Sequence, residues 1–327
     1  MISFFRSNLF INSILLLPYI VLLRLSGLVY KKDIIVNDQT SYFYKSISSL
    51  FESSITSCLF ASFLVFFQCI LINRMCIKHK LGRDQTLVPG LMYATITALL
   101  PDFIQLSEPL LATTFFIASI NYILNTYNNI KASSEVFLFS FFIGLAAIIY
   151  FPFFYFIFFG LISLLLMKSY TIKDLVQQLV GLFLPTIFLA SYLYYMNGDI
   201  SQVTKYFSDH IGLNLVLLVS DLKGLVVSSF TIITILFVLF NYSVYSRARA
   251  TSSQKKIDVF FWIIAFSGLT LMVTVFPQYS HLYILFIPLS IFISFSILSV
   301  KNKIVAEIFH LTMVVFALII QFEVIQI

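Results

Sequence analysis

Charged residues are scarce in this chain: they make up 10% of its 327 residues, whereas 60% of the residues are hydrophobic. A soluble domain of this length needs far more charged surface to stay in solution. The apolar residues form runs of about 18 or more, each long enough to cross a bilayer as a helix. These runs lack the alternation of a membrane barrel. The sequence therefore predicts an all-α, polytopic transmembrane bundle, with 1–327 as a single integral membrane domain.

Motifs for metal, nucleotide and covalent chemistry are also missing. The 3 cysteines form no Cys-x-x-Cys pair, and the 4 histidines lack zinc-ligand spacing. There is no Walker loop, GxGxxG or GxSxG. Glu307 and His310 form one Glu-x-x-His, a motif that helical bundles use for metals only in pairs, so with Lys303 nearby we expect a charge-paired helix start. We expect no cofactor and no metal ion.

Glycine is rare, with 10 residues, whereas there are 38 phenylalanines. Close helix contacts in membranes use small residues spaced four apart. We therefore expect these helices to pack mostly through bulky, interdigitating side chains.

Apolar length indicates about eleven spans. Several of the segments are shorter than about 20 residues, the usual length of a crossing. Merging 136–151 with 153–167 around Pro152 is an alternative. The predicted segments are 9–29, 53–73, 86–101, 104–125, 136–151, 153–167, 179–196, 225–244, 259–277, 281–299 and 304–324.

The placement of lysine and arginine gives an orientation. With the N-terminus inside and the C-terminus outside, all of the 20 bases except six fall on the inner side, as the positive-inside rule expects. The merged alternative would place the basic stretch 247–256 outside. Because the bases alternate with the spans, the net charge of +6 indicates membrane lipids rather than nucleic acid as partner. The six outer bases are Arg24, Lys31, Lys32, Lys45, Lys205 and Lys223.

Two outer segments, 31–52 and 197–224, are too polar to span a bilayer. They mix aromatic, aliphatic and charged residues. They are either amphipathic helices lying in the membrane interface or ordered outer loops.

Ionisable groups at the outer ends of the spans are the candidates for chemistry, because each is costly there without a partner. Asp102 and Glu108 occupy the shortest outer turn, between Pro101 and Pro109. Proline begins or ends helices at such places, and a carboxylate near a helix N-terminus is stabilised by the helix dipole. Either capping or a catalytic role accounts for these two acids.

Arg24 lies near the outer end of the first span. One interpretation is that its side chain snorkels to the headgroups with Lys31 and Lys32. The other is that Arg24 and Lys32 hold a lipid phosphate, or that they pair with Asp102 or Glu108.

Two stretches carry a resemblance to known proteins. They are SEPLLATTFFIASINYILNTYNNIKASSEVFLFSFFIGLAAIIYFPFFYFIFFGLISLLL, residues 107–166, and KKIDVFFWIIAFSGLTLMVTVFPQYSHLYILFIPLSIFISFSIL, residues 255–298. With the short basic N-terminus, they resemble a family of uncharacterised bacterial inner-membrane proteins, a domain of unknown function. The resemblance implies a multi-pass protein of the bacterial inner membrane.

The first stretch is also, more distantly, similar to the core of the GT-C glycosyltransferases. That resemblance implies a sugar donor linked to polyprenyl phosphate and a catalytic acid in an outer loop. The matching acids are Asp33 or Asp38, with Asp102 and Glu108 from the second outer turn. An outer carboxylate would act as general base, and Arg24 or Lys32 would neutralise the lipid phosphate. The chain departs from the family in its short first outer loop and in lacking a large outer domain.

Two functions follow from the sequence. The first is a GT-C-like protein that binds or transfers polyprenyl-phosphate-linked sugar at the outer face of the membrane. The alternative is a non-catalytic membrane subunit or scaffold of an envelope-assembly or secretion complex, with other membrane or envelope proteins as partners. A cavity in which outer acids meet outer bases would favour the first.

Overall fold

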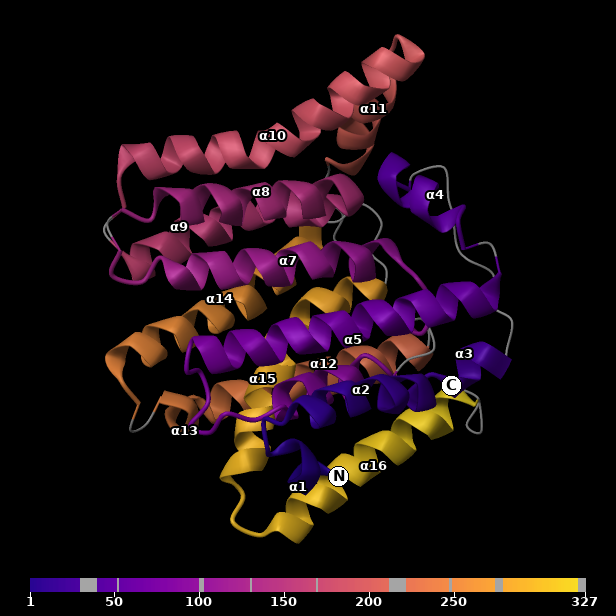
Figure 1. Cartoon of the computed structure of the whole chain (residues 1–327), viewed down its shortest axis with the longest axis vertical. Helices are drawn as coiled ribbons and strands as arrows, with labels where there is room; N and C mark the ends of the chain where they lie inside the picture. Colours follow the sequence, from indigo (N-terminus) through magenta and orange to yellow (C-terminus); the bar gives the residue numbers. More distant parts are fainter. Residues whose placement is uncertain are drawn as a thin grey trace.

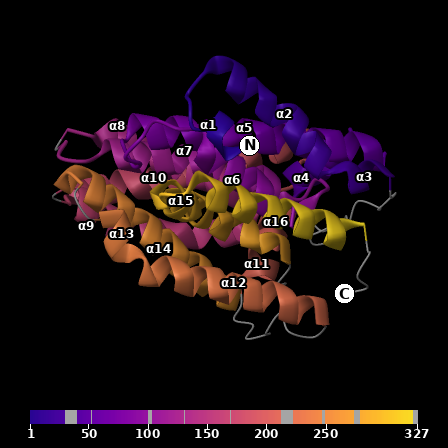
Figure 2. The same cartoon turned by 90° about the horizontal axis from the view of Figure 1, so that it is seen from below.

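The computed structural model describes residues 1–29, 40–51, 53–99, 103–129, 131–168, 170–211, 222–246, 249–273 and 279–322. Within these ranges every regular element is a helix and there is no strand, so the predicted all-α class is confirmed. The helices lie side by side in a slab, with α10 near one edge and α16 at the other (Figure 1). Turned by 90°, α2, α5, α7 and α8 form one layer, α12 and α14 lie in another, and α15 and α6 lie between them (Figure 2).

Each predicted apolar segment contains a helix. These are α2 (Phe10–Leu23), α5 (Ser54–Lys78), α6 (Val88–Ile96), α7 (Glu108–Asn125), α8 (Ser133–Ile149), α9 (Phe156–Met167), α10 (Ile172–Asn197), α12 (Leu222–Phe240), α14 (Thr251–Val273), α15 (Tyr283–Ser299) and α16 (Lys303–Gln321). The connections contain α1 (Ile2–Phe5), α3 (Leu25–Val29), α4 (Tyr42–Ser48), α11 (Ser201–His210), α13 (Tyr242–Ser246) and two 3₁₀ turns, η2 (Phe151–Tyr155) and η3 (Tyr279–Leu282).

Among the described residues, three helices are long and apolar enough to cross a membrane: α5, α10 and α16. Other apolar helices are shorter. The shortest of the eleven, α6, covers only the middle of the predicted segment 86–101, and its length of about 14 Å is half of a bilayer core. All of its residues are buried, so protein rather than lipid surrounds it, which is where a membrane protein tolerates a broken helix.

The connections gather at two ends of the bundle. At one end, which we call the basic end, Leu87 N–H donates to Phe5 C=O over 2.9 Å, and Asn128 N–H donates to Met167 C=O over 3.1 Å. At the opposite end, the Tyr283 hydroxyl donates to Phe103 C=O. These hydrogen bonds join connections and helix ends that are far apart in the sequence.

Gln68 is the best-satisfied polar side chain inside the bundle. Its Nε2 donates to Leu110 C=O and to the Thr114 hydroxyl, both over 2.8 Å, and its Oε1 accepts from the Tyr93 hydroxyl over 2.7 Å. Gln68 is fully buried on α5, Tyr93 lies on α6, and the other two partners lie on α7. The amide therefore joins three helices. Leaving its polar groups without hydrogen bonds in an apolar interior would cost several kcal/mol.

The α8–α10 pair is packed through glycine, unlike the bulky packing predicted for the bundle. A Cβ at Gly144 of α8 would collide with the backbone carbonyl of Leu182 on α10. A Cβ at Gly181 of α10 would in turn collide with the backbone carbonyl of Phe137 on α8. The two glycines bring the two backbones into close approach, as small residues do between membrane helices.

A buried ion pair closes the turn between α9 and α10 at the basic end. Lys168 Nζ lies 2.6 Å from Asp174 Oδ1, and both side chains are only 2% exposed. The other carboxylate oxygen accepts from the N–H and the hydroxyl of Thr171, whose side chain caps α10 in return. This reciprocal capping box satisfies the first turn of the helix.

We predict that Asp174→Asn lowers the stability of the protein by about 3–5 kcal/mol, because it leaves the buried Lys168 ammonium without its counter-ion. Thermal unfolding in detergent measures the change. The matched control is Glu135→Gln, in the first turn of α8, whose carboxylate bonds only the exposed hydroxyl of Ser134. Equal melting temperatures for the two variants would contradict a stabilising role for the pair.

A second cluster at the basic end surrounds His79, the C-cap residue of α5. Its Nε2 donates to Asn121 Oδ1 over 3.0 Å, and its Nδ1 accepts from Lys256 Nζ over 3.3 Å. Lys78 Nζ also donates to Asn121 Oδ1, over 3.3 Å. Burial lowers the pKa of His79 to about 4; the hydrogen bond to Asn121 opposes this change, and the charges of Lys256 and Lys78 add to it. The imidazole is therefore neutral between two lysines.

We predict that this histidine makes the fold acid-sensitive. The folded protein protonates His79 near pH 4, whereas the unfolded chain does so near its ordinary value of 6.5. Stability is therefore lost as the pH falls through this window, by up to about 3 kcal/mol from this group. Between pH 7 and pH 4.5, the melting temperature of His79→Gln should fall less than that of the wild type. Equal losses would contradict the assignment.

Candidate functional site

Four of the six site residues predicted from the sequence lie outside the described residues: Asp33, Asp38, Asp102 and Lys32. The other two, Arg24 and Glu108, lie near the opposite end of the bundle but in different surroundings. The side chain of each forms a hydrogen bond with a backbone group, and among the described residues no hydrogen bond or ion pair joins Arg24 to Glu108. The side chains around each of these two residues therefore decide whether it belongs to a site.

Arg24 is buried in the bundle, with 1% of its surface exposed, and does not reach the surface as the snorkelling interpretation expected. It ends α2, and its Nη1 donates to Ile104 C=O over 3.2 Å. The Nε and Nη2 groups have no hydrogen-bond partner among the described residues. Arg24 lines none of the cavities described here, so it does not contribute to the site built below.

Glu108 is the first residue of α7 and fastens α4 to it. Its Oε1 accepts from the backbone N–H of Ser41 over 2.6 Å, and Ser41 caps α4 by accepting from Tyr44 N–H. The Tyr44 hydroxyl donates to Leu106 C=O over 2.9 Å. Burial raises the pKa of Tyr44 above its usual range, so the hydroxyl remains a donor. Both the carboxylate and the phenol therefore hold α4 against the start of α7.

The predicted outer segments 31–52 and 197–224 each contain a short helix. In the first, α4 occupies part of the described residues. In the second, α11 begins after Asp199, whose carboxylate accepts from the N–H of Ser201 over 2.9 Å and from its hydroxyl. These two hydrogen bonds lower the pKa of Asp199. The carboxylate thus stays charged at the helix N-terminus, where the helix dipole favours it.

A cavity of about 310 Å³ lies between α4 and α11, which Figure 1 places near each other at the opposite end. We call it the α4–α11 cavity. Its polar lining contains two lysines, a histidine and one acid, together with two tyrosines. The lining residues are Thr40, Tyr42, Lys45, Gln202, Lys205, Tyr206, Asp209 and His210.

The cavity is positively charged. Lys45 and Lys205 contribute two cations against the single carboxylate of Asp209. Glu108 accepts from the backbone N–H of Ser41, which lies between the lining residues Thr40 and Tyr42, so this acid stands beside the cavity lining. His210 Nδ1 donates to Tyr206 C=O over 2.8 Å, which orients its ring. Two ammonium groups beside an imidazole can bind a phosphate group.

Aromatic rings form the wall behind the cavity. The Tyr206 and His210 rings lie 4.6 Å apart, and Phe151 of η2 stands 5.9 Å from His210 and 5.5 Å from Phe207. The Tyr206 hydroxyl donates to Ala147 C=O of α8 over 3.4 Å. This wall fixes α11 against the end of α8, so the bases of α11 are presented from a packed surface.

Sequence reasoning named Glu108 but missed the bases that surround it. Lys45, Lys205 and His210 were recognised only as outer charges or as histidines without zinc spacing. The amphipathic character of 31–52 and 197–224 was the available signal, because two such segments at the same end can enclose a polar space.

Glu307 has a role at the basic end that differs from the one predicted. Its carboxylate accepts from the Met1 amino group over 2.6 Å and from the N–H groups of Ile2 and Ser3, rather than pairing with Lys303. His310 instead bonds the Tyr19 hydroxyl over 3.0 Å. No group of three metal-binding side chains occurs within the described ranges.

We predict that Glu108→Ala releases α4, because the loss of its acceptor oxygen leaves the backbone N–H of Ser41 unsatisfied, at a cost of about 1–3 kcal/mol. Amide exchange over Tyr42–Ser48 should become about tenfold faster or more, whereas Glu108→Gln, which keeps an acceptor oxygen, should remain near the wild type. The control is Glu135→Ala at the start of α8. Unchanged protection of α4 in Glu108→Ala would rule out the clamp.

The α4–α11 cavity is thus a basic, aromatic-walled space with a clamped carboxylate nearby. No family model, curated protein or solved structure matches the chain, so what this site binds is argued from its own residues.

Proposed function

We propose that the protein is a multi-pass protein of the bacterial inner membrane with about eleven crossings, its N-terminus inside and its C-terminus outside. Support comes from the lysines at the basic end: Lys168 and Lys301 lie in connections between helices, Lys78 ends α5, and Lys256 lies near the start of α14. In this orientation the basic end faces the cytoplasm. The α4–α11 cavity then opens at the outer face of the membrane.

We further propose that the cavity binds a sugar linked to polyprenyl phosphate, on a scaffold like that of the GT-C glycosyltransferases. The observation that carries this proposal is the convergence of Lys45, Lys205 and His210 around one space of about 310 Å³. The phosphate would pair with the two lysines, and the sugar would lie on the ring of Tyr42 or Tyr206. The apolar gap lined by Ile148, Leu189 and Leu193 beside the cavity gives the prenyl chain an apolar neighbour.

A transfer reaction would use the nearby acid. Glu108 would take the proton of the acceptor hydroxyl as that oxygen attacks the anomeric carbon of the sugar. The bond from that carbon to the phosphate oxygen breaks, and the released polyprenyl phosphate is neutralised by Lys45 and Lys205. Asp33, Asp38 and Asp102, which the resemblance also nominates, are alternative bases, and Arg24 and Lys32 are alternative phosphate ligands.

The alternative, a scaffold subunit of an envelope-assembly or secretion complex, would use an apolar docking face. The exposed side of α10 offers one, with Ile187, Phe188 and Tyr195 at its surface. Membrane lipid accounts equally well for such a face in a crossing helix. The convergent bases of the cavity have no corresponding explanation, so the sugar–phosphate ligand is preferred.

We predict that Lys45→Gln/Lys205→Gln weakens binding of a short-chain polyprenyl-phosphate hexose by about tenfold or more, because each lost charge-assisted contact removes about 1.5–3 kcal/mol. Native mass spectrometry of the purified protein in detergent measures the bound fraction. Lys301→Gln/Lys303→Gln removes the same charge from exposed lysines at the basic end and should bind as the wild type does.

The Glu108→Gln variant distinguishes a glycosyltransferase from a protein that only binds the lipid-linked sugar. Retained binding with loss of sugar transfer in membrane vesicles supports transfer, whereas retained binding with no transfer by the wild type supports a carrier or sensor. Equal binding by the wild type and the double lysine variant would overturn the cavity as the ligand site.

A further inference from the structure

The exposed face of α5 changes from apolar to cationic along its length. Leu59, Phe63 and Phe67 are 46%, 55% and 44% exposed. Arg74 and Lys78 are exposed further along the same helix. The spacings of four, four, seven and four residues place all five on one helical face. The face therefore presents apolar rings first and then two cations at the basic end.

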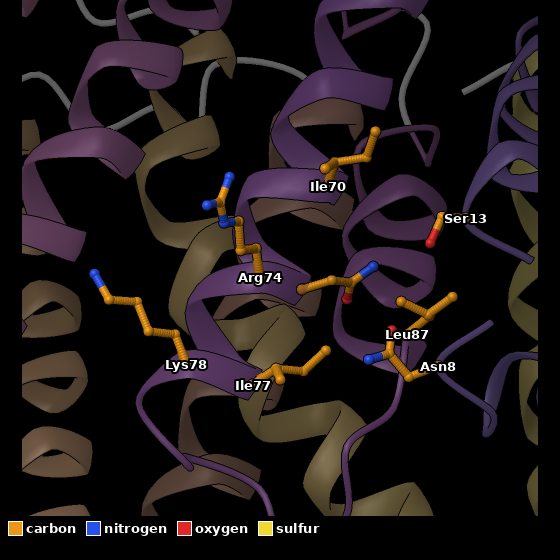
Figure 3. Close-up of a pocket in the computed structure, with 8 residues that line it drawn as sticks. Asn8, Ser13, Ile70, Arg74, Ile77, Lys78 and Leu87 are labelled. Carbon is orange, nitrogen blue, oxygen red and sulfur yellow. The ribbon is translucent and has the colours of Figure 1, made fainter. Parts of the chain in front are cut away.

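A groove of about 290 Å³ lies at this cationic end. Its other side is formed by residues near the start of α2 and before α6. Figure 3 shows that Arg74 and Lys78 leave α5 in the same direction, while Asn8 and Leu87 lie on the other side of the helix. The lining residues are Asn8, Ser13, Ile70, Asn73, Arg74, Ile77, Lys78 and Leu87.

The groove holds an unpaired buried donor. Asn73 is 2% exposed; its Oδ1 accepts from Gly90 N–H over 2.7 Å, while its Nδ2 has no hydrogen-bond partner in the part of the chain that the structure describes. An orphaned amide donor inside an apolar bundle is costly, and native proteins satisfy nearly all such groups. Since the residue lines the groove, a ligand oxygen placed there would supply the missing acceptor.

Among the described residues, no carboxylate forms an ion pair with Arg74 or Lys78. The ion pairs within the described residues are Met1–Glu307 and Lys168–Asp174, and neither involves α5. Lys78 Nζ donates to the neutral Asn121, and the next residue is the neutral, buried His79, which accepts from Lys256. The surroundings of Arg74 and Lys78 thus add positive charge and favour an anionic ligand.

We propose that this groove binds an anionic glycerophospholipid of the membrane leaflet at the basic end, a second site separate from the α4–α11 cavity. The phosphate diester would pair with Arg74 and Lys78, and a headgroup or phosphate oxygen would accept from Asn73. Basic pockets between transmembrane helices on the cytoplasmic side bind anionic headgroups in this way.

A lipid fits better than a free phosphate ester because the apolar rings continue directly from the cations. The rise of a helix places Phe67 about 10 Å below Arg74, the level that acyl chains occupy beneath their headgroup. Ile70, one turn before Arg74, and Ile77, directly before Lys78, also line the groove. A soluble phosphate ester has no acyl chain to contact the exposed ring of Phe67.

The test compares phosphatidylglycerol with phosphatidylcholine of the same acyl chains, added to the delipidated full-length protein in detergent. Native mass spectrometry should show a preference for phosphatidylglycerol of about tenfold. Arg74→Gln/Lys78→Gln should abolish this preference, and the exposure of both side chains leaves the fold intact, as circular dichroism can verify. Lys301→Gln/Lys303→Gln, with the same charge change at the same end, should retain it.

Three outcomes would overturn the proposal. They are equal binding of the two lipids by the wild type, an unchanged preference in Arg74→Gln/Lys78→Gln, and binding of glycerol 3-phosphate as tight as that of the lipid, which would assign the groove to a free phosphate ester. Lys45→Gln/Lys205→Gln should leave the lipid preference unaltered. Failure of this site is therefore distinguishable from failure of the outer cavity.

Discussion

The structure depends on satisfying polar groups inside an apolar bundle. Gln68 is the central case, since its amide uses two donors and an acceptor to join α5, α6 and α7. Apolar side chains alone fix the position of a helix weakly in such surroundings, because lipid is as apolar as leucine. Because the Gln68 amide loses these hydrogen bonds when the helices shift, it favours one arrangement of the bundle.

The same constraint divides the ionisable residues into structural and ligand-facing groups. Lys168 and Asp174 satisfy each other inside the fold, and Glu108 satisfies a backbone donor of α4. Arg24 is one exception, since two of its nitrogens have no partner within the described part of the chain. The bases of the α4–α11 cavity and of the α5 groove stand instead around open spaces. Basic side chains that line a cavity are the feature that both proposed binding sites share.

The sequence predicted the helices well and their ends poorly. Each predicted apolar run overlaps a helix of the described chain, because hydrophobic length is a property of neighbouring residues. The break at Arg24 and the shortness of α6 follow from tertiary packing, which lets protein replace lipid around a broken helix. Runs of apolar residues alone cannot reveal such packing.

The candidate site was predicted only in part, for a related reason. Glu108 was chosen because it lies at an outer helix end, and it does lie there. One interpretation paired it with Arg24 or Lys32, whereas the hydrogen bond found comes from the backbone N–H of Ser41. The meeting of Lys45 with Lys205 joins segments far apart in the chain, and no spacing within one sequence encodes it.

The glycine contact between α8 and α10 has a mechanical consequence for the cavity. From Gly181 to the end of α10 the helix extends about 24 Å, and α11 follows directly. With the contact at Gly144 and Gly181 as pivot, a tilt of about 5° would displace the start of α11 by about 2 Å. The close packing at these two glycines therefore helps to fix the direction of α10, and with it the position of α11 and the width of the cavity.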